Sequence, residues 1–538
     1  MKIFLMKRRE FLKAGLLSGA AAIASPLMAD VQDQYQAPKP SDLDEATISD
    51  LQKAMTSGKE TAHSITLKYL ARIEEIDRNG PTLRSVIETN TEALAHADRL
   101  DKLRAEGTIR GPLHGIPILI KDNIETGDKM MTTAGSLALL GNVAAHDAHI
   151  VALMRKAGAI ILGKTNLSEW ANFRSTHSSS GWSGRGGQTR NPYALDRNPC
   201  GSSSGSGVAT SANLCAAAVG SETDGSIVCP SSNNGLVGIK PTLGLLSRSG
   251  IIPLSHSQDT AGPMARTVRD AAILLGVLAG VDPSDPATKG FKGVADYTKF
   301  LDSGGLKGAR IGIARKYFGF NDRVDALMHN AIQAMKDLGA IIVDPTDLPN
   351  HEKYGDTEQE VLLYDFKHDI NAYLGARHLE AKSLADLIKI NEKLKDTELQ
   401  FFGQELFIQA QAKGPLTDKK YIDALARNHR MAGTEGIDAI MDKHKLDAIF
   451  APTGGPAWTT DLVNGDHFSG GSSTPAAVAG YPAITLPAGY IRGLPVGLTL
   501  FGRAWSEPTL IKLAYSFEQA TKVRRAPKFL LTAELKGT

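Results

Sequence analysis

A short apolar run that ends in a glycine- and serine-rich turn sets the strongest limit on how this chain folds. Residues 215–219 (CAAAV) have small side chains, which predict a tightly packed, buried element. Residues 220–226 (GSETDGS) follow, and Gly220 and Gly225 permit tight turns and close backbone approach. Successive backbone N–H groups in such a turn can point into one hollow and bind an anion. Because Ser226 ends the turn, the stretch is either an ordinary Gly/Ser turn or a nucleophile beside an anion-binding loop, as acyl transfer requires.

Two further stretches favour the second interpretation. Residues 198–207 (NPCGSSSGSG) could form a flexible linker, but apolar and aromatic sequence flanks them, which suits the wall of a pocket. Residues 116–120 (IPILI) predict a buried strand, and Lys121 leaves its end. A lysine at a strand end is usually solvated, whereas one held in an apolar wall has a lowered pKa and can act as a base.

The order of these motifs resembles that of the amidase signature family. The Lys121-Asp122-Asn123 strand end, the Gly/Ser-rich loop and the Gly225-Ser226-Ile227 turn precede residues 479–484 (AGYPAI) and 493–497 (GLPVG). The resemblance covers nearly the whole chain after its first 29 residues. It implies an α/β fold in which a large mixed β-sheet is covered by helices on both faces.

The resemblance also implies a catalytic triad of two serines and a lysine. Carried over by motif, Ser226 is the nucleophile, Ser202 is the bridging serine and Lys121 is the base. The family's bridging serine follows a cis peptide bond, so Gly201–Ser202 is expected to be cis, which is rare outside proline. Backbone N–H groups would bind the oxyanion, and no cofactor or metal is implied. These donors belong to Thr223, Asp224, Gly225 and Ser226.

Part of the chain is most similar to the bacterial peptide amidases of this family, which remove the C-terminal amide of peptides. The similarity lies in residues 168–174 (SEWANFR), 181–183 (GWS) and 186–193 (GGQTRNPY). Many family members have two glycines before the nucleophile, whereas this chain has Asp224-Gly225. The Asp224 carboxylate either accepts a hydrogen bond from the amide N–H of a peptide or small-molecule substrate, or only braces its own turn.

Charge and cysteine content limit the other possibilities. The net charge of +2 over 538 residues gives no preference for nucleic acid or for an anionic membrane. Three cysteines, an odd number, do not make a disulfide framework. Cys200 and Cys229 flank the two catalytic loops, which leaves a contact between them open, but the expected role is that of small buried side chains.

The first 29 residues have the pattern of a twin-arginine export signal. Residues 7–13 (KRREFLK) contain the paired arginines, residues 14–27 are weakly hydrophobic, and residues 27–29 (LMA) offer a cleavage site. The alternative is a membrane anchor, but the apolar run is short for a span. We therefore expect a periplasmic, monomeric protein with one amidase domain over residues 30–538, free of the membrane once the signal is removed.

The rest of the chain alternates between helical and strand patterns. A helical pattern extends from Asp44 to about residue 106, and short strands then alternate with helices over about 110–270, the core signature region, which indicates a layered α/β fold. Residues 355–445 are strongly helical. They either cover one edge of the sheet or also form one wall of the substrate cleft.

Three other motifs are set aside. Residues 158–165 (GAIILGKT) match a phosphate-binding loop, but their apolar middle predicts a buried strand. Ser203 lies in a G-x-S-x-G motif without the preceding strand that a nucleophile elbow needs. His146 and His149 have the spacing of a metal pair but lack further ligands, so they are expected to be surface residues.

Three functions remain open. The first is an exported amidase, specific for peptide amides or of the general aliphatic or aryl type. The second is the A-type component of a tRNA-dependent amidotransferase, against which the export signal argues. The third is a binding protein without activity, against which the intact set of Lys121, Ser202 and Ser226 argues.

Overall fold

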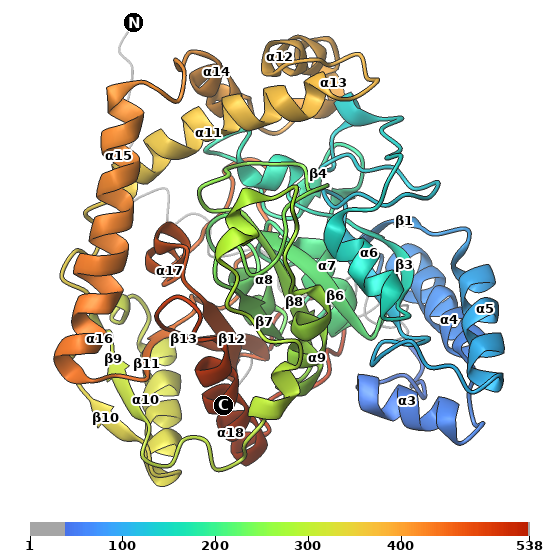
Figure 1. The fold of residues 1–538 in the computed structure, drawn as a ribbon, viewed down its shortest axis with the longest axis horizontal. Coiled ribbons are helices and arrows are strands. Elements are labelled where there is room, and N and C mark those ends of the chain that lie inside the picture. The colour runs from blue at the N-terminus through green and yellow to red at the C-terminus, as the bar shows by residue number, and fades with distance from the viewer. Residues whose placement is uncertain (1–37, 536–538) are drawn as a thin grey trace, which may run out of the picture. The chain divides into compact units, whose positions relative to one another are not determined.

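An eleven-stranded sheet organises the computed structural model, which describes residues 38–535 (Figure 1). Its strand order is β1-β3-β2-β6-β8-β7-β12-β13-β11-β9-β10. The strands are β1 Val86–Thr89, β2 Pro117–Lys121, β3 Ile160–Thr165, β6 Ala217–Glu222, β7 Val237–Lys240, β8 Thr260–Ala265, β9 Arg310–Ile313, β10 Ile341–Val343, β11 Ala448–Pro452, β12 Ala483–Ile491 and β13 Leu494–Phe501. Parallel pairs join β2 to β3 and β6, and β9 to β10 and β11, while the other pairs are antiparallel. The mixed sheet confirms the predicted fold class.

The strands that carry the candidate site are buried on both sides. Every residue of β2 (PILIK), β3 (IILGKT) and β6 (AAVGSE) is buried. Their runs of small and apolar side chains are typical of parallel strands covered on both faces. A separate two-stranded ribbon pairs β4 (Trp182–Ser183) with β5 (Gly187–Gln188). Polar side chains on the central strands, such as that of Lys121, are therefore removed from water.

Helices cover both faces of the sheet. α7 and α8 pack against each other and against β6, β7 and β12, whereas α9, α10 and α18 pack against β8 and β12. The helices are α3 Ile48–Thr56, α4 Ala62–Arg72, α5 Ala93–Ala105, α6 His149–Lys156, α7 Ser204–Ser211, α8 Val228–Asn233, α9 Val268–Leu278, α10 Asp322–Asp337, α11 Gly355–Gly375, α12 Leu384–Lys393, α13 Lys395–Glu398, α14 Glu405–Gln411, α15 Lys419–His429, α16 Ala439–His444, α17 Thr474–Ala479 and α18 Glu507–Thr521.

The structure corrects two sequence-based boundaries. The helical pattern predicted from Asp44 to about residue 106 is interrupted by β1, which forms the edge of the sheet beside β3. The turn predicted to begin at Gly220 begins at Thr223, because Gly220–Glu222 continue β6 and pair with β8. Gly220 is needed there for space: a Cβ would lie 2.8 Å from both Ser203 Oγ and Met264 Sδ.

The helical region of residues 355–445 contains α11 to α16, and α11 to α14 gather at the top of Figure 1. Its aromatic side chains pack against the segment around Trp170. The ring centroids of Trp170 and Phe407 are 5.6 Å apart, and those of Phe173 and Phe366 are 5.3 Å apart. Such edge-to-face pairs add to the burial of apolar surface in fixing the region. α11 thereby lies against the same segment that borders the candidate site.

Of the described residues, 40–535 belong to one compact unit. The predicted export signal, residues 1–29, lies outside the described residues. Within residues 38–535, none of the helices combines the length and apolar character needed to span a bilayer.

Candidate active site

Lys121, the last residue of β2, lies fully buried beneath two serine-bearing loops. Its Nζ donates to Ser202 Oγ at 2.8 Å, to Ser221 Oγ at 3.0 Å and to the Ser221 carbonyl at 3.1 Å. Burial lowers the pKa of Lys121 to about 7, although the carboxylates of Asp259 and Glu222 oppose the shift. The lowered pKa allows Lys121 to lose a proton near neutral pH, and the neutral amine can then accept the proton of the Ser202 hydroxyl instead of donating to it.

Ser202 is held by the loop that leads into α7. The Gly201–Ser202 peptide bond is cis, as predicted. The Ser202 carbonyl accepts a hydrogen bond from the Ser168 N–H at 3.0 Å. A Cβ on Gly201 would lie 2.1 Å from Ser168 Oγ, so only glycine fits there. The loop is thus fixed with the Ser202 hydroxyl toward Lys121.

Ser226 lies between β6 and α8, beside the loop of Ser202. The Ser203 N–H donates to the Ser226 carbonyl at 3.1 Å, which ties the two loops together. Gly225 has a φ of +79°, a left-handed conformation that a side chain would disfavour. Among the described residues, no hydrogen bond joins Ser202 Oγ and Ser226 Oγ; hydrogen bonds of a catalytic site often tighten only when substrate binds. The backbone of Ser226 therefore contacts the loop that carries Ser202, and the Ser202 hydroxyl contacts Lys121.

The turn before Ser226 leaves its backbone N–H groups free of partners. The buried Glu222 carboxylate accepts the N–H groups of Ile227 and Val228, at 2.7 and 3.0 Å. In contrast, none of the N–H groups of residues 223–226 donates to an acceptor in the part of the chain that the structure describes. Glu222 shapes the turn and leaves four donors available to an oxyanion. These are the groups of Thr223, Asp224, Gly225 and Ser226.

Ser221 is a partner of Lys121 that sequence reasoning missed. Its hydroxyl also accepts from Asn123 Nδ2 at 2.9 Å, and its carbonyl accepts from Ser203 Oγ at 2.9 Å. The register of β2 against β6 pairs Ile120 with Val219, which brings Lys121 next to Ser221. A prediction of how β2 pairs with β6 could have identified Ser221 as a neighbour of Lys121.

Two cavities are lined by residues that neighbour the triad in the sequence, although Lys121, Ser202 and Ser226 themselves line neither. The first, of about 250 Å³, extends from Ser221 and Thr223 to His256 and Asp369, and its walls are mainly apolar. The second, of about 370 Å³, is more polar and reaches Gly201, Asp224 and Gly225. Aromatic side chains of Trp170 and of Phe366 on α11 line the first cavity. The helical region is therefore one wall of the cleft as well as a cover.

Asp224 lines the second cavity and is held from outside its own turn. Its Oδ2 accepts from Thr474 Oγ1 on α17 at 2.7 Å, while its Oδ1 is buried without a hydrogen-bond partner among the described residues. Burial raises the pKa of Asp224, although hydrogen bonding with Ser473, Thr474 and Glu358 opposes the shift. Burial and the neighbouring Asp224 carboxylate raise the pKa of Glu358 well above its usual value. The free oxygen is an unfilled acceptor beside Gly225 and Ser226.

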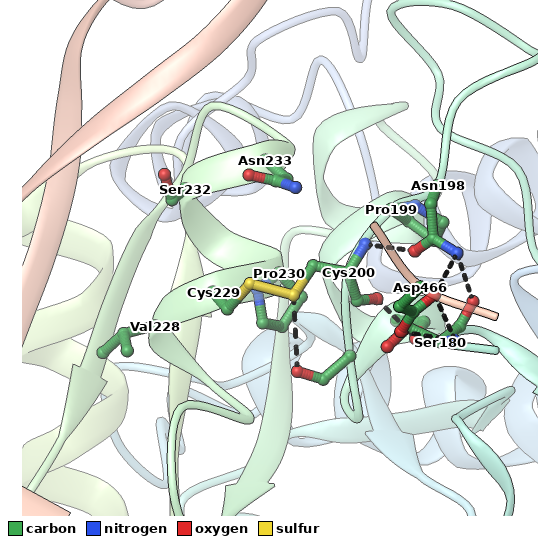
Figure 2. The surroundings of a disulfide bond; sticks show 12 residues. Ser180, Asn198, Pro199, Cys200, Val228, Cys229, Pro230, Ser232, Asn233 and Asp466 are labelled. Atoms are coloured by element: carbon green, nitrogen blue, oxygen red, sulfur yellow. Dashed lines mark hydrogen bonds between the residues drawn. A yellow bond between two sulfur atoms is a disulfide. The ribbon is translucent and has the colours of Figure 1, made fainter. Parts of the chain in front are cut away.

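A disulfide bond joins Cys200 and Cys229 and links the two candidate catalytic loops (Figure 2). The Cα atoms are 6.0 Å apart, and the bond spans 29 residues of sequence. The expectation that these two cysteines are only small buried side chains was wrong, because folding brings the residue before Gly201 beside the first turn of α8. The third cysteine, Cys215, is free and buried.

The motifs that were set aside have structural roles. Residues Ile160–Thr165 form β3, so most of the segment that matches a phosphate-binding loop is a buried strand, as predicted. The Ser203 hydroxyl accepts the Ser221 N–H at 3.1 Å and donates to the Ser221 carbonyl, which leaves it committed to the backbone of β6. His146 is exposed and His149 is half-buried.

Comparisons with known proteins agree with this arrangement. The sequence matches the family described as Amidase over residues 64–511. A probable amidase of Arabidopsis thaliana is 43% identical over 500 residues, which cover 91% of this chain and 92% of that protein. The A-type component of the glutamyl-tRNA(Gln) amidotransferase of Moorella thermoacetica is 34% identical over 489 residues, covering 89% and 97%. The structure of native peptide amidase from Stenotrophomonas maltophilia is similar with a TM-score of 0.87 at 51% identity, covering 91% and 100%.

Proposed function

Since the chain belongs to the Amidase family and is therefore an amide-hydrolysing enzyme, we propose that it removes the C-terminal amide of peptides as ammonia. The observation that carries the proposed chemistry is the buried 2.8 Å contact between Lys121 Nζ and Ser202 Oγ, next to Ser226. The proposed substrate is supported by the 51% identity to a peptide amidase and by the two cavities lined by sequence neighbours of Ser202 and Ser226.

The proposed mechanism is a proton relay through Ser202. Neutral Lys121 accepts the Ser202 proton, Ser202 accepts the proton of Ser226, and Ser226 Oγ attacks the amide carbonyl carbon. The four N–H groups of residues 223–226 stabilise the negative charge that develops on the carbonyl oxygen. The relay then returns a proton to the leaving nitrogen, which departs as ammonia. Water hydrolyses the acyl-enzyme by the same route and yields the free carboxylate.

Asp224 is proposed to select the substrate. Its Oδ1, which has no hydrogen-bond partner among the described residues, is proposed to accept a hydrogen bond from the amide N–H of the substrate. A free C-terminal carboxylate would instead meet like charge at the same place. The mainly apolar first cavity is proposed to receive part of the peptide chain.

Substrate choice is tested by comparing an amidated dipeptide with its free-acid form and with a simple aliphatic amide. We expect kcat/KM for ammonia release from the amidated dipeptide to exceed that of the aliphatic amide by at least roughly tenfold, because binding energy from the peptide part promotes the reaction. The free-acid peptide should remain intact at its internal bond. Faster hydrolysis of the aliphatic amide would contradict the peptide assignment and leave a general amidase.

The same assay separates the proposal from an amidotransferase component. The amidotransferase relative is 34% identical, against 51% for the peptide amidase. The purified single chain should release ammonia without a partner chain or tRNA. A dependence on added partners would assign it to the other group, and inactivity towards every amide would favour a binding protein.

We also propose that the chain is exported to the periplasm as a folded protein. The twin-arginine pattern of residues 7–13 motivates the proposal. The disulfide between Cys200 and Cys229 supports it, because disulfides form and persist in oxidising compartments such as the bacterial periplasm.

Replacing Arg8 and Arg9 together with lysine should block export. We expect the variant to accumulate in the cytoplasm in its longer, uncleaved form, since this type of signal is read through its paired arginines. Cell fractionation with immunoblotting measures it, and replacing Lys7 with arginine serves as a charge-preserving control outside the pair. Normal processing of the double variant would rule out the twin-arginine route.

A further inference from the structure

Two histidines and two aspartates form a cluster at the edge of the first cavity. His256 lies in the loop before β8, and Asp365, His368 and Asp369 lie on α11, where residues three and four apart share a face. His256 Nδ1 is 2.9 Å from Asp369 Oδ2, and His368 Nδ1 is 2.9 Å from Asp369 Oδ1. His256 Nδ1 is also 3.6 Å from Asp365 Oδ1. Four potential metal ligands therefore converge from two elements far apart in sequence.

The cluster has a supporting set of hydrogen bonds. Asp365 is fully buried, and its Oδ2 accepts from Ser255 Oγ at 2.7 Å. Its Oδ1 lies near the His256 imidazole and has no hydrogen-bond partner within the described residues. Asp369 Oδ2 accepts a hydrogen bond from the backbone N–H of His256 at 2.8 Å. On the other side of the ring, Tyr421 Oη lies 3.3 Å from His256 Nε2. Metal-binding histidines usually engage their second ring nitrogen in this way.

The chemistry of the cluster suits a divalent cation. Two carboxylates face two imidazoles, and the nearby Arg248 is engaged by Asp285, with Arg248 Nη2 at 2.6 Å from Asp285 Oδ1. Imidazole nitrogen and carboxylate oxygen are common ligands of Zn²⁺. The ligand atoms of His256, His368 and Asp369 lie within 4.8 Å of one another, whereas tetrahedral Zn²⁺ ligands are about 3.4 Å apart. The imidazoles are 40% and 58% exposed and have room to rotate inward.

We propose that His256, His368 and Asp369, with Asp365 behind them, bind one divalent transition-metal ion such as Zn²⁺, and that the bound ion slows turnover. The site differs from the triad, because Lys121, Ser202 and Ser226 are not among the residues that line this cavity. His256 and Asp369 line the same cavity as Ser221 and Thr223, which lie beside the triad in the sequence. An ion that pulls the two imidazoles together narrows the cavity next to His256. The proposed slowing of turnover rests on the proposed function, in which peptide substrates enter the first cavity. The proposed binding of the metal ion does not depend on it.

Binding is tested directly, without reference to activity. The chelator-treated full chain is titrated with Zn²⁺ by calorimetry, and with Co²⁺, whose visible absorption reports tetrahedral nitrogen and oxygen ligands. We expect one ion per chain. His368→Gln and Asp365→Asn should each weaken binding at least tenfold. His378→Gln, which changes an exposed histidine just beyond α11, is the matched control and should bind like the wild type.

Thermal melting without metal establishes that each variant is folded. The proposed site would be overturned if the wild type bound no metal, or if wild type and His368→Gln bound it equally. It would also be overturned if His378→Gln lost as much metal affinity as His368→Gln.

For the second part of the proposal, Zn²⁺ should raise KM for an amidated peptide several-fold in the wild type and leave the KM of His368→Gln unchanged. Binding without any change in KM would overturn the link to turnover.

Discussion

Replacing Ser226 with alanine should reduce kcat by on the order of 10⁴-fold or more, because no acyl-enzyme can then form. The Ser226 hydroxyl makes no hydrogen bond among the described residues, so its removal should leave the folded structure intact. The measurement is ammonia release from an amidated dipeptide, together with the melting temperature of the variant. Mass spectrometry of the quenched wild-type reaction should detect an acyl group on the Ser226 peptide.

Ser231→Ala is the matched control for this prediction. Ser231 lies on α8, five residues after Ser226, and its buried hydroxyl also has no hydrogen-bond partner among the described residues. Its loss should change kcat less than about twofold, since it leaves no polar group unsatisfied. Ser202→Ala should cost nearly as much as Ser226→Ala, and the double variant should be little worse, because residues that act as a unit are not additive. Substantial activity of Ser226→Ala would remove the proposed mechanism.

The second large effect is a pH dependence set by Lys121. Burial lowers the pKa of Lys121 to about 7, and the base must be neutral to accept a proton. Protonation below this pKa therefore inactivates the enzyme, and kcat/KM should fall roughly tenfold per pH unit on the acidic side. Above the pKa the base is already neutral, so the profile should be level there. Initial rates from about pH 5.5 to about pH 9 measure the profile.

Variants assign the acidic limb to its residue. Lys121→Ala should lose roughly 10² to 10⁴-fold in kcat/KM, and its residual rate should lack the limb. Other buried groups also have pKa values close to 7. Among them, burial lowers the pKa of Lys164 to about 8 and raises that of Asp259 to about 6. Lys164→Met should therefore retain a limb near pH 7, whereas Asp259→Asn should retain the limb but shift it to lower pH, because the Asp259 carboxylate raises the pKa of Lys121. A wild-type rate that is independent of pH, or a limb that persists in Lys121→Ala, would exclude Lys121 as the base.

Local sequence patterns were sufficient to locate the parts of the site. The apolar run of residues 116–120 predicted the strand that ends at Lys121, and the structure has β2 there. The cis bond at Gly201–Ser202 followed from the family resemblance and is present. The extent of β6 could not be predicted, because Gly220, Ser221 and Glu222 have turn-forming composition and are held in a strand by their pairing with β8.

Contacts between distant residues explain what sequence reasoning missed. Asp224 and Thr474 are 250 positions apart, and their hydrogen bond depends on where α17 packs. The pairing of Cys200 with Cys229 likewise depends on the approach of two loops, since an odd number of cysteines favours no particular bond. The cluster of His256 with His368 and Asp369 combines a loop and a helix that no sequence motif connects.

The sequence by itself determined which chemical groups are present, their order and the α/β class, because side-chain periodicity and turn residues act over a few positions. Only the tertiary structure decided what those groups can do. Lys121 has its lowered pKa because the folded chain excludes water around it. Ser221 accepts a hydrogen bond from Lys121 only because β2 pairs with β6. Burial and hydrogen bonding depend on all neighbours of a residue at once, and most of these neighbours lie far away along the chain.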